Sequence, residues 1–160
     1  MFQLGVLTCS DKGALGQRVD KSGKLIQEIL EKNGFHLSFY DIIPDDIETI
    51  KTNLLNLSEP NHLDLIVTTG GTGITQRDVT PEATRAILDK EIIGISEIIR
   101  VKTFELNPLS IISRAICGYR NKTLILNLPG NPKAINECLD VILPVLDHTI
   151  KLIKSDSLEH

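Results

Sequence analysis

The part of this sequence best suited to chemistry is a glycine- and threonine-rich run between Thr68 and Thr84. It holds Gly70, Gly71 and Gly73, with one arginine and one aspartate further along. The run follows an apolar segment typical of a strand and leads into the start of a helix. Glycine allows close approach of the backbone, successive N–H groups form an anion-binding nest, and a helix start adds a positive dipole. This composition predicts a binding loop for a phosphate group or a nucleotide.

The loop matches neither of the two common glycine-rich phosphate motifs. No Gly-Lys-Ser/Thr sequence ends it, as a P-loop requires. The dinucleotide fingerprint Gly-x-Gly-x-x-Gly is also absent. Glycine-rich turns between a strand and a helix are common in α/β proteins, and many of them only reverse the chain. Taken alone, the run therefore leaves both interpretations open.

Three further loops follow apolar segments and carry unusual polar residues. Ligands in open α/β sheets bind beyond the carboxyl ends of the parallel strands. Loops that leave such ends therefore converge if the strands are parallel. The four loops cover residues 10–23, 44–46, 70–78 and 128–133.

Aspartates lie in three of these loops, so one sheet edge would bring Asp11, Asp45 and Asp78 together. Carboxylates beside a phosphate-binding backbone indicate Mg²⁺ held by one or two of them and by the substrate's own phosphates. Each aspartate also has a structural interpretation. Asp11 could close a turn, and Asp45 or Asp46 could cap the next helix, with Asp46 favoured. Asp78 could cap a helix too, but Thr80 fits that position better.

The composition indicates a single globular domain. The chain has 160 residues, of which 41% are hydrophobic, and a net charge of −4. That charge argues against a non-specific nucleic-acid binder. Basic residues nonetheless lie in or beside the unusual segments, which favours a small anionic ligand, although each could be a solvated surface charge. These residues are Arg77, Arg114, Arg120, Lys122 and Lys133.

The three cysteines are widely spaced and indicate neither a zinc site nor a disulfide framework. Cys9 and Cys117 lie in apolar segments and are expected in the core. No signal-peptide pattern and no run long enough to cross a membrane is visible, so we expect a cytoplasmic protein. Residues 158–160 look like the remnant of an expression tag, which leaves one expected domain over residues 1–157.

The hydrophobic pattern alternates between strands and helices, which predicts a three-layer α/β/α sandwich. Its sheet should be mostly parallel with one antiparallel strand. Strands are expected at 4–8, 35–43 and 65–69, with an antiparallel pair at 116–119 and 123–127. Helices are expected at 22–33, 46–57, 81–88, 96–104 and 131–153, and Pro144 should kink or split the last of them.

The motifs, taken in order, resemble those of the MogA/MoaB family of molybdenum-cofactor biosynthesis proteins, which is related to the G domains of gephyrin and plant Cnx proteins. The resemblance covers nearly the whole chain. It rests on Ser10-Asp11, Asp20-x-Ser22-Gly23, Ile43-Pro44-Asp45, residues 69–73 and 77–84, Ser113-Arg114-Ala115, Gly118-x-Arg120 and residues 127–134.

The resemblance implies a molybdopterin adenylyltransferase, which uses ATP and Mg²⁺ to join AMP to the terminal phosphate of molybdopterin and releases pyrophosphate. Asp45 and Asp78 would be catalytic by organising the metal and the triphosphate. It also implies a homotrimer that could hand its product to a downstream molybdenum-insertion enzyme, with no nucleic-acid or membrane partner. The implied substrate-binding residues are Ser10, Asp11, Gly70, Gly71, Thr72, Gly73, Thr80, Ser113, Arg114, Pro129, Gly130 and Lys133.

Two other functions stay open at this stage. The chain is short beside some family members, and the related domain of MoeA proteins supports molybdenum insertion, so this chain could bind molybdopterin for insertion. It could also be a trimeric G-domain-like scaffold without catalysis. Retention of Asp45 and Asp78 favours the enzyme.

Overall fold

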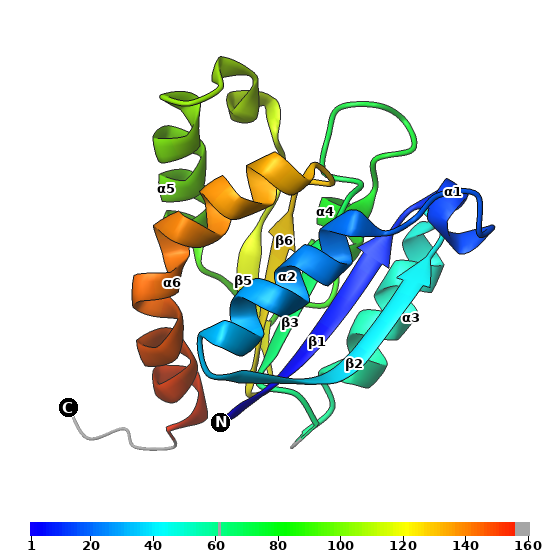
Figure 1. Cartoon of the computed structure of the whole chain (residues 1–160). Coiled ribbons are helices and arrows are strands. Elements are labelled where there is room, and N and C mark those ends of the chain that lie inside the picture. The colour runs from blue at the N-terminus through cyan, green and yellow to red at the C-terminus, as the bar shows by residue number, and fades with distance from the viewer. Residues whose placement is uncertain (61, 156–160) are drawn as a thin grey trace.

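Three buried strands form the centre of the sheet because their sequences are apolar at successive positions. β1 (Phe2–Cys9), β3 (Leu65–Thr69) and β6 (Thr123–Leu128) run parallel, and β3 and β6 are buried throughout. Strands covered on both faces need this continuous pattern instead of an alternating one. The computed structural model describes residues 1–60 and 62–155, so the expected tag remnant at 158–160 lies outside the described residues. The six strands are ordered β2-β1-β3-β6-β5-β4 (Figure 1).

The outer strands confirm the predicted mixture of directions. β2 (Phe35–Ile43) runs parallel to β1 at one edge. On the other side, β5 (Cys117–Arg120) pairs antiparallel with both β6 and the two-residue β4 (Lys90–Glu91). One strand is therefore antiparallel to the rest. The sequence pattern did not predict β4, because two residues carry no detectable periodicity.

Helices cover both faces of the sheet, as the three-layer prediction requires (Figure 1). One apolar cluster joins one face of the sheet to three helices, and a second joins the other face to two. A short α1 follows β1, and a 3₁₀ helix, η1, follows α5. The first face carries α2 (Lys21–Lys32), α5 (Ile93–Phe104) and α6 (Pro132–Lys154), and the second carries α3 (Ile47–Leu57) and α4 (Thr80–Arg85). The remaining helices are α1 (Asp11–Ala14) and η1 (Pro108–Ile112).

Three helix starts differ from the prediction, and that of α2 differs only by one residue, since α2 begins at Lys21. Thr80 is the first residue of α4 and not its cap, because the cap position falls on Val79, which makes no capping hydrogen bond. The Thr80 hydroxyl instead donates to the Gly70 carbonyl at 3.0 Å, so the glycine-rich loop takes the group that a cap would use. The other difference is α5, which begins three residues earlier than expected, at Ile93. In contrast, Asp46 caps α3 as predicted, since its carboxylate accepts from the Thr49 N–H at 2.9 Å.

The last helix is one element in spite of its internal proline. α6 begins after the predicted cap, Asn131, and continues past Pro144 to Lys154 without a break. Its axis changes direction part-way along (Figure 1), which agrees with a kink and excludes a split. Leu139, Ile142 and Leu146 keep both halves buried in the same core.

The remaining core predictions are confirmed. Cys9 and Cys117 are both buried, and burial raises the pKa of each thiol to about 12. In the described part of the chain, no helix is long and apolar enough to span a membrane.

The parallel arrangement brings the loops after β1, β2, β3 and β6 to one edge of the sheet. Backbone hydrogen bonds tie neighbouring loops together at their bases. The Ser10 N–H donates to the Ile43 carbonyl at 2.8 Å, and the Gly70 N–H donates to the Leu128 carbonyl at 3.1 Å. The predicted convergence of the four loops is therefore confirmed.

Candidate functional site

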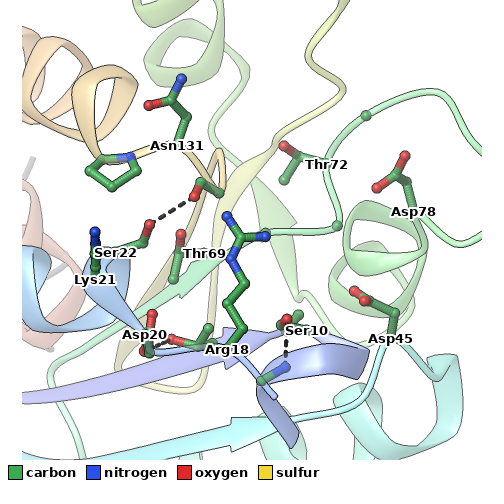
Figure 2. Close-up of a pocket in the computed structure, with 18 of the residues that line it drawn as sticks. Ser10, Arg18, Asp20, Lys21, Ser22, Asp45, Thr69, Thr72, Asp78 and Asn131 are labelled. Carbon is green, nitrogen blue, oxygen red and sulfur yellow. Dashed lines mark hydrogen bonds between the residues drawn. The ribbon is translucent and has the colours of Figure 1, made fainter. Parts of the chain in front are cut away.

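A cavity of about 890 Å³ opens between these loops and the start of α2 (Figure 2). Its size suits a ligand larger than a single phosphate. Eight of the residues expected to act on or bind substrate line it. They are Ser10, Asp45, Gly70, Gly71, Thr72, Gly73, Asp78 and Gly130.

The glycine-rich loop needs glycine at two successive positions. Gly70 and Gly71 have φ angles of 93° and 67°, which L side chains rarely adopt. A Cβ on Gly70 would lie 2.4 Å from the Cys9 carbonyl oxygen. On Gly71 it would lie 2.4 Å from the Thr80 Oγ1 and 3.0 Å from the Asp45 Oδ1. The loop thus passes directly against the end of β1 and against a candidate catalytic carboxylate.

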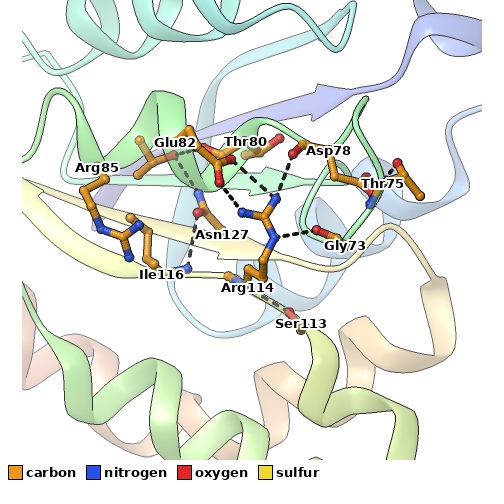
Figure 3. Close-up of polar contacts among 12 residues, drawn as sticks. Gly73, Thr75, Asp78, Thr80, Glu82, Arg85, Ser113, Arg114, Ile116 and Asn127 are labelled. Atoms are coloured by element: carbon orange, nitrogen blue, oxygen red, sulfur yellow. Dashed lines mark hydrogen bonds and ion pairs between the residues drawn. The ribbon is translucent and has the colours of Figure 1, made fainter.

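Arg114 holds this loop through hydrogen bonds to two of its carbonyl groups (Figure 3). Its Nε donates to the Gly73 carbonyl at 2.7 Å, and its Nη2 donates to the Asp78 carbonyl at 2.8 Å. It also forms an ion pair with Glu82 on α4. Arg114 does not line the cavity, so in this arrangement its contribution is to fix the two loop positions that do.

Asp45 presents a buried carboxylate oxygen to the site. Its Oδ2 accepts from the Asp11 N–H at 3.1 Å, whereas its Oδ1 is buried and has no hydrogen-bond partner among the described residues. Burial raises the pKa of Asp45, and the negative charges of Asp11 and then Asp78 add to that rise. A buried carboxylate oxygen without a partner is costly. A cation or a donor on a ligand would remove that cost.

Asp78 is fixed by its own turn. Its Oδ2 accepts from the Thr75 N–H at 2.9 Å and from the Thr75 hydroxyl at 2.7 Å. The carboxylate therefore does not cap α4, and Figure 2 places it on the same side of the cavity as Asp45.

Asp11 converges with Asp45 but does not line the cavity. Each of the two carboxylates accepts from the backbone N–H of the other, at 3.0 and 3.1 Å. Asp11 also takes a two-point contact from Arg77, with its Oδ2 3.0 Å from Nε and 2.7 Å from Nη2. The hydrogen bond from Arg77 lowers the pKa of Asp11. Arg77 and Asp11 thus form an ion pair with each other at the rim of the cavity.

The α2 side of the cavity depends on a partly buried anchor, Asp20. Its Oδ2 accepts from the Thr8 and Tyr40 hydroxyls, both at 2.6 Å, and its Oδ1 accepts from the Gly23 N–H at 2.9 Å. The Ser22 hydroxyl then donates to the Gly130 carbonyl at 2.7 Å. These bonds fix the starts of α2 and α6 beside the cavity. Helix N-termini favour anions.

A second, smaller pocket adjoins the first. It has a volume of about 240 Å³ and lies between α5, η1 and the start of α6. Ser113 and Pro129 line this pocket instead of the main cavity, while Thr72, Gly73 and Asn131 line both.

Comparison with known proteins agrees with this architecture. The family model described as "Probable molybdopterin binding domain" matches residues 5–148. The chain belongs to this family. It is 42% identical over 154 residues to a protein named molybdopterin adenylyltransferase from Helicobacter pylori strain J99, which covers 95% of this chain and 88% of that protein. It is 37% identical over 146 residues to molybdenum cofactor biosynthesis protein B from Bacillus cereus, covering 89% of this chain and 85% of that protein.

Solved structures show the same fold. The crystal structure of the molybdopterin biosynthesis enzyme MoaB from Thermus thermophilus has a TM-score of 0.90 and is 44% identical, with 96% of each chain covered. The tungsten cofactor synthesizing protein MoaB from Pyrococcus furiosus has a TM-score of 0.88 and is 37% identical, covering 97% of this chain and 98% of that one.

The cations that this family member presents to its cavity are not those singled out from the sequence. Arg114 and Arg77 are ion-paired, and Arg120 lies 3.5 Å from Glu59. Lys133 is exposed and outside the lining of the main cavity. The basic residues that line it are Arg18 and Lys21. Sequence reasoning singled out Asp20-x-Ser22-Gly23 but missed these two cations, because that motif leaves the residue at position 21 open and does not include Arg18.

The site also suits the metal that the family resemblance implies. Within residues 1–60 and 62–155, no cluster of three or more His, Cys, Asp or Glu side chains could cage a metal ion. Mg²⁺ does not need such a cage, since it is commonly held by one or two carboxylates together with water and substrate phosphates. The partnerless Oδ1 of Asp45, with Asp78 nearby, fits that mode of binding.

Proposed function

We propose that this protein is a molybdopterin adenylyltransferase that transfers AMP from ATP to the terminal phosphate of molybdopterin, with Mg²⁺ as cofactor. The observation that carries the proposal is the partnerless, buried Oδ1 of Asp45. It lies beside the glycine-rich loop in a cavity large enough for a nucleotide. The names of relatives about 40% identical support the same activity.

The chemistry matches what these residues can supply. The acceptor is a phosphate monoester that is already anionic near neutral pH, so the reaction needs no strong general base. One of its oxygens attacks the α-phosphorus of ATP and forms the new P–O bond. The bond from the α-phosphorus to the bridging oxygen breaks, and pyrophosphate leaves with the electron pair. The main barrier is bringing two anions together, which positioning and fixed dipoles lower.

Each side of the cavity has a role in this proposal. Asp45 and Asp78 would hold the metal that accompanies the triphosphate. Bound Mg²⁺ would supply neutralisation of phosphate charge in the transition state. Backbone N–H groups of Gly71, Thr72 and Gly73 donate to phosphate oxygens, whereas the Gly70 N–H is bonded to the Leu128 carbonyl. Thr80 and Arg114 position that loop, since they bond its carbonyls from outside the cavity lining.

The adjoining pocket offers a place for a flat ring. It is mostly apolar, with a hydroxyl from Ser113 and the ring of Pro129 among its lining groups. We propose that it binds the ring of one of the two substrates, because it shares Thr72 and Gly73 with the main cavity.

We also propose that residues 1–157 form one domain. We propose further that the protein assembles as a homotrimer. Exposed apolar side chains gather on α5, η1 and the turn between them, and such surfaces mark interaction sites. They are Val101, Phe104, Leu106, Leu109, Ile111 and Ile112. Sedimentation velocity should give three times the chain mass of 17.7 kDa, whereas a stable monomer at micromolar concentration would contradict the trimer.

Incubation of the protein with molybdopterin, ATP and Mg²⁺ tests the activity directly. Chromatography should resolve an adenylylated pterin that forms only when all three are present. A protein that serves molybdenum insertion would instead consume adenylylated pterin in response to molybdate, and a scaffold would do neither. If folded protein and active substrate yield no adenylylated pterin, the proposed function is wrong.

A further inference from the structure

We propose that Arg18 and Lys21 form a metal-independent subsite for the phosphate monoester of the acceptor. This subsite lies opposite the carboxylates that take the metal-bound triphosphate. The inference rests on the proposed function, because it divides that one cavity between the two substrates. It assigns roles to two side chains that lie outside the motifs of the glycine-rich loop.

The cavity has two sides of opposite charge. Arg18 and Lys21 line it from the segment before α2 and from the first residue of α2. In Figure 2 the Arg18 side chain extends toward the middle of the cavity, with Ser22 on one side and Asp45 and Asp78 on the other. Asp45 and Asp78 are therefore on one wall, and Arg18 and Lys21 are on the other, together with the Asp20 carboxylate, which also lines the cavity and accepts three hydrogen bonds.

Arg18 and Lys21 are free to bind an anion. Neither has an ion-pair partner among the residues that the structure describes. The cations nearer the glycine-rich loop are committed, since Arg77 pairs with Asp11 and Arg114 pairs with Glu82. Among the described residues that line the cavity, the basic side chains without an ion-pair partner are therefore on the α2 side. A phosphate that arrives without a metal ion can bind to them there.

The two substrates differ in what they carry into the cavity. ATP enters with a divalent cation, which two carboxylates attract. The acceptor is a monoester with a charge of about −1.5 to −2 at neutral pH, and bare carboxylates repel it. The starts of α2 and α6 add positive dipole to the cationic wall. Electrostatic attraction and repulsion therefore favour binding of the acceptor phosphate at Arg18 and Lys21.

Asp20 makes this wall rigid enough to serve as a subsite. It takes three hydrogen bonds, from Thr8, Tyr40 and the Gly23 N–H. In the sequence it lies two residues after Arg18 and directly before Lys21. A Cβ on Gly23 would lie 2.2 Å from the Asp20 Oδ2, so the start of α2 is packed directly against this anchor. The backbone that carries Arg18 and Lys21 is therefore held in place before any ligand binds.

Calorimetry with three charge-removing variants tests the subsite. The variants are Arg18→Met, Lys21→Met and, as the matched control, Lys24→Met, whose side chain is exposed on the same helix but outside the cavity lining. Molybdopterin binding is measured in EDTA, and Mg²⁺-ATP binding is measured without acceptor. Inorganic phosphate in EDTA, followed by ³¹P line broadening, serves as a probe that does not depend on the pterin. Circular dichroism confirms that each variant is folded.

Arg18→Met and Lys21→Met should each weaken molybdopterin binding in EDTA by about tenfold or more, the loss expected for a charge-assisted hydrogen bond. Mg²⁺-ATP affinity should change by less than about threefold, as in Lys24→Met. If the two variants weaken Mg²⁺-ATP instead, or leave molybdopterin affinity at the Lys24→Met value, the subsite is wrong while the proposed function can still stand. If phosphate binds and depends on both cations but molybdopterin does not bind, the anion subsite stands and the proposed function fails.

Discussion

The two walls of the cavity are built in different ways. The carboxylate wall consists of a tight loop with two positive-φ glycines and a buried, partnerless oxygen of Asp45, and nearly every polar group around it is already engaged. The α2 wall presents the exposed side chains of Arg18 and Lys21 beside a partly buried anchor, Asp20. A site that must join two anions can thus separate them by charge, one taken with a metal ion and one without.

The largest effect should come from removing either carboxylate. Asp45→Asn and Asp78→Asn should each lower the rate of adenylyl transfer by at least about a hundredfold, because each loses a charge that holds the metal. The rate is measured by quantifying adenylylated pterin under saturating substrates.

Asp46→Asn is the matched control, since Asp46 is adjacent but caps α3 from outside the cavity lining. It should retain most of the activity and lose a little thermal stability. Near-wild-type turnover in a folded Asp78→Asn variant would remove Asp78 from the proposed mechanism.

The next effect should come from filling the loop. Gly71→Val places a side chain against Thr80 and Asp45 at a φ of 67°, so it should abolish measurable nucleotide binding in calorimetry. Gly34→Val is the control for backbone strain alone. Gly34 has a φ of 89°, but a Cβ there would meet no neighbouring atom. Both variants should lose stability, but only Gly71→Val should lose binding. Equal nucleotide affinity in the two variants would contradict the close approach assigned to the loop.

A smaller effect should follow from releasing the loop. Arg114→Met removes the donors to the Gly73 and Asp78 carbonyls, so turnover should fall by about tenfold and hydrogen exchange between residues 71 and 79 should speed up. Arg85→Met is the control, since Arg85 makes only a long contact to Glu91. An Arg114→Met variant with unchanged exchange in the loop would show that other contacts fix its shape.

The smallest effect concerns the pH dependence of stability. Burial raises the pKa of Asp45 above its unfolded value of 3.8, so the stability that this group contributes is fully present below that value and is lost as pH rises through the folded pKa. Without metal, Asp45→Asn should therefore become more stable relative to wild type between about pH 4 and about pH 7. Urea denaturation in EDTA at both pH values measures this difference.

Added Mg²⁺ should reverse this advantage at neutral pH, because it binds wild type and not the variant. A stability difference that does not change with pH would contradict a buried, uncompensated charge at Asp45.

Local sequence predicted most of the scaffold because its ends are clearly marked. The strand bounds at Phe35–Ile43 were predicted correctly, since Gly34 precedes that strand and Pro44 follows it. Thr80 was misplaced because a hydroxyl before a proline resembles a cap, whereas its partner is a carbonyl ten residues earlier. The role of Arg114 was also beyond local pattern, since its bonds span 36 to 41 residues.

The sequence predicted which four loops converge, including residues 10–23, but not which cations line the cavity. The glycine-rich loop constrains its own sequence, because its backbone admits only glycine at Gly70 and Gly71. An exposed arginine or lysine places no such constraint on the residues next to it in the sequence. Arg18 and Lys21 become a wall only when the anchor under α2 is seen in three dimensions.

Release of pyrophosphate from ATP by the wild-type protein tests the central claim most directly. With Mg²⁺ and molybdopterin, the protein should release one pyrophosphate for each adenylylated pterin formed. It should release none when either molybdopterin or Mg²⁺ is omitted, because the acceptor is the pterin phosphate and not water. Pyrophosphate release at the same rate without molybdopterin, or its absence in the complete mixture with folded protein, would contradict the assignment of this cavity to adenylyl transfer.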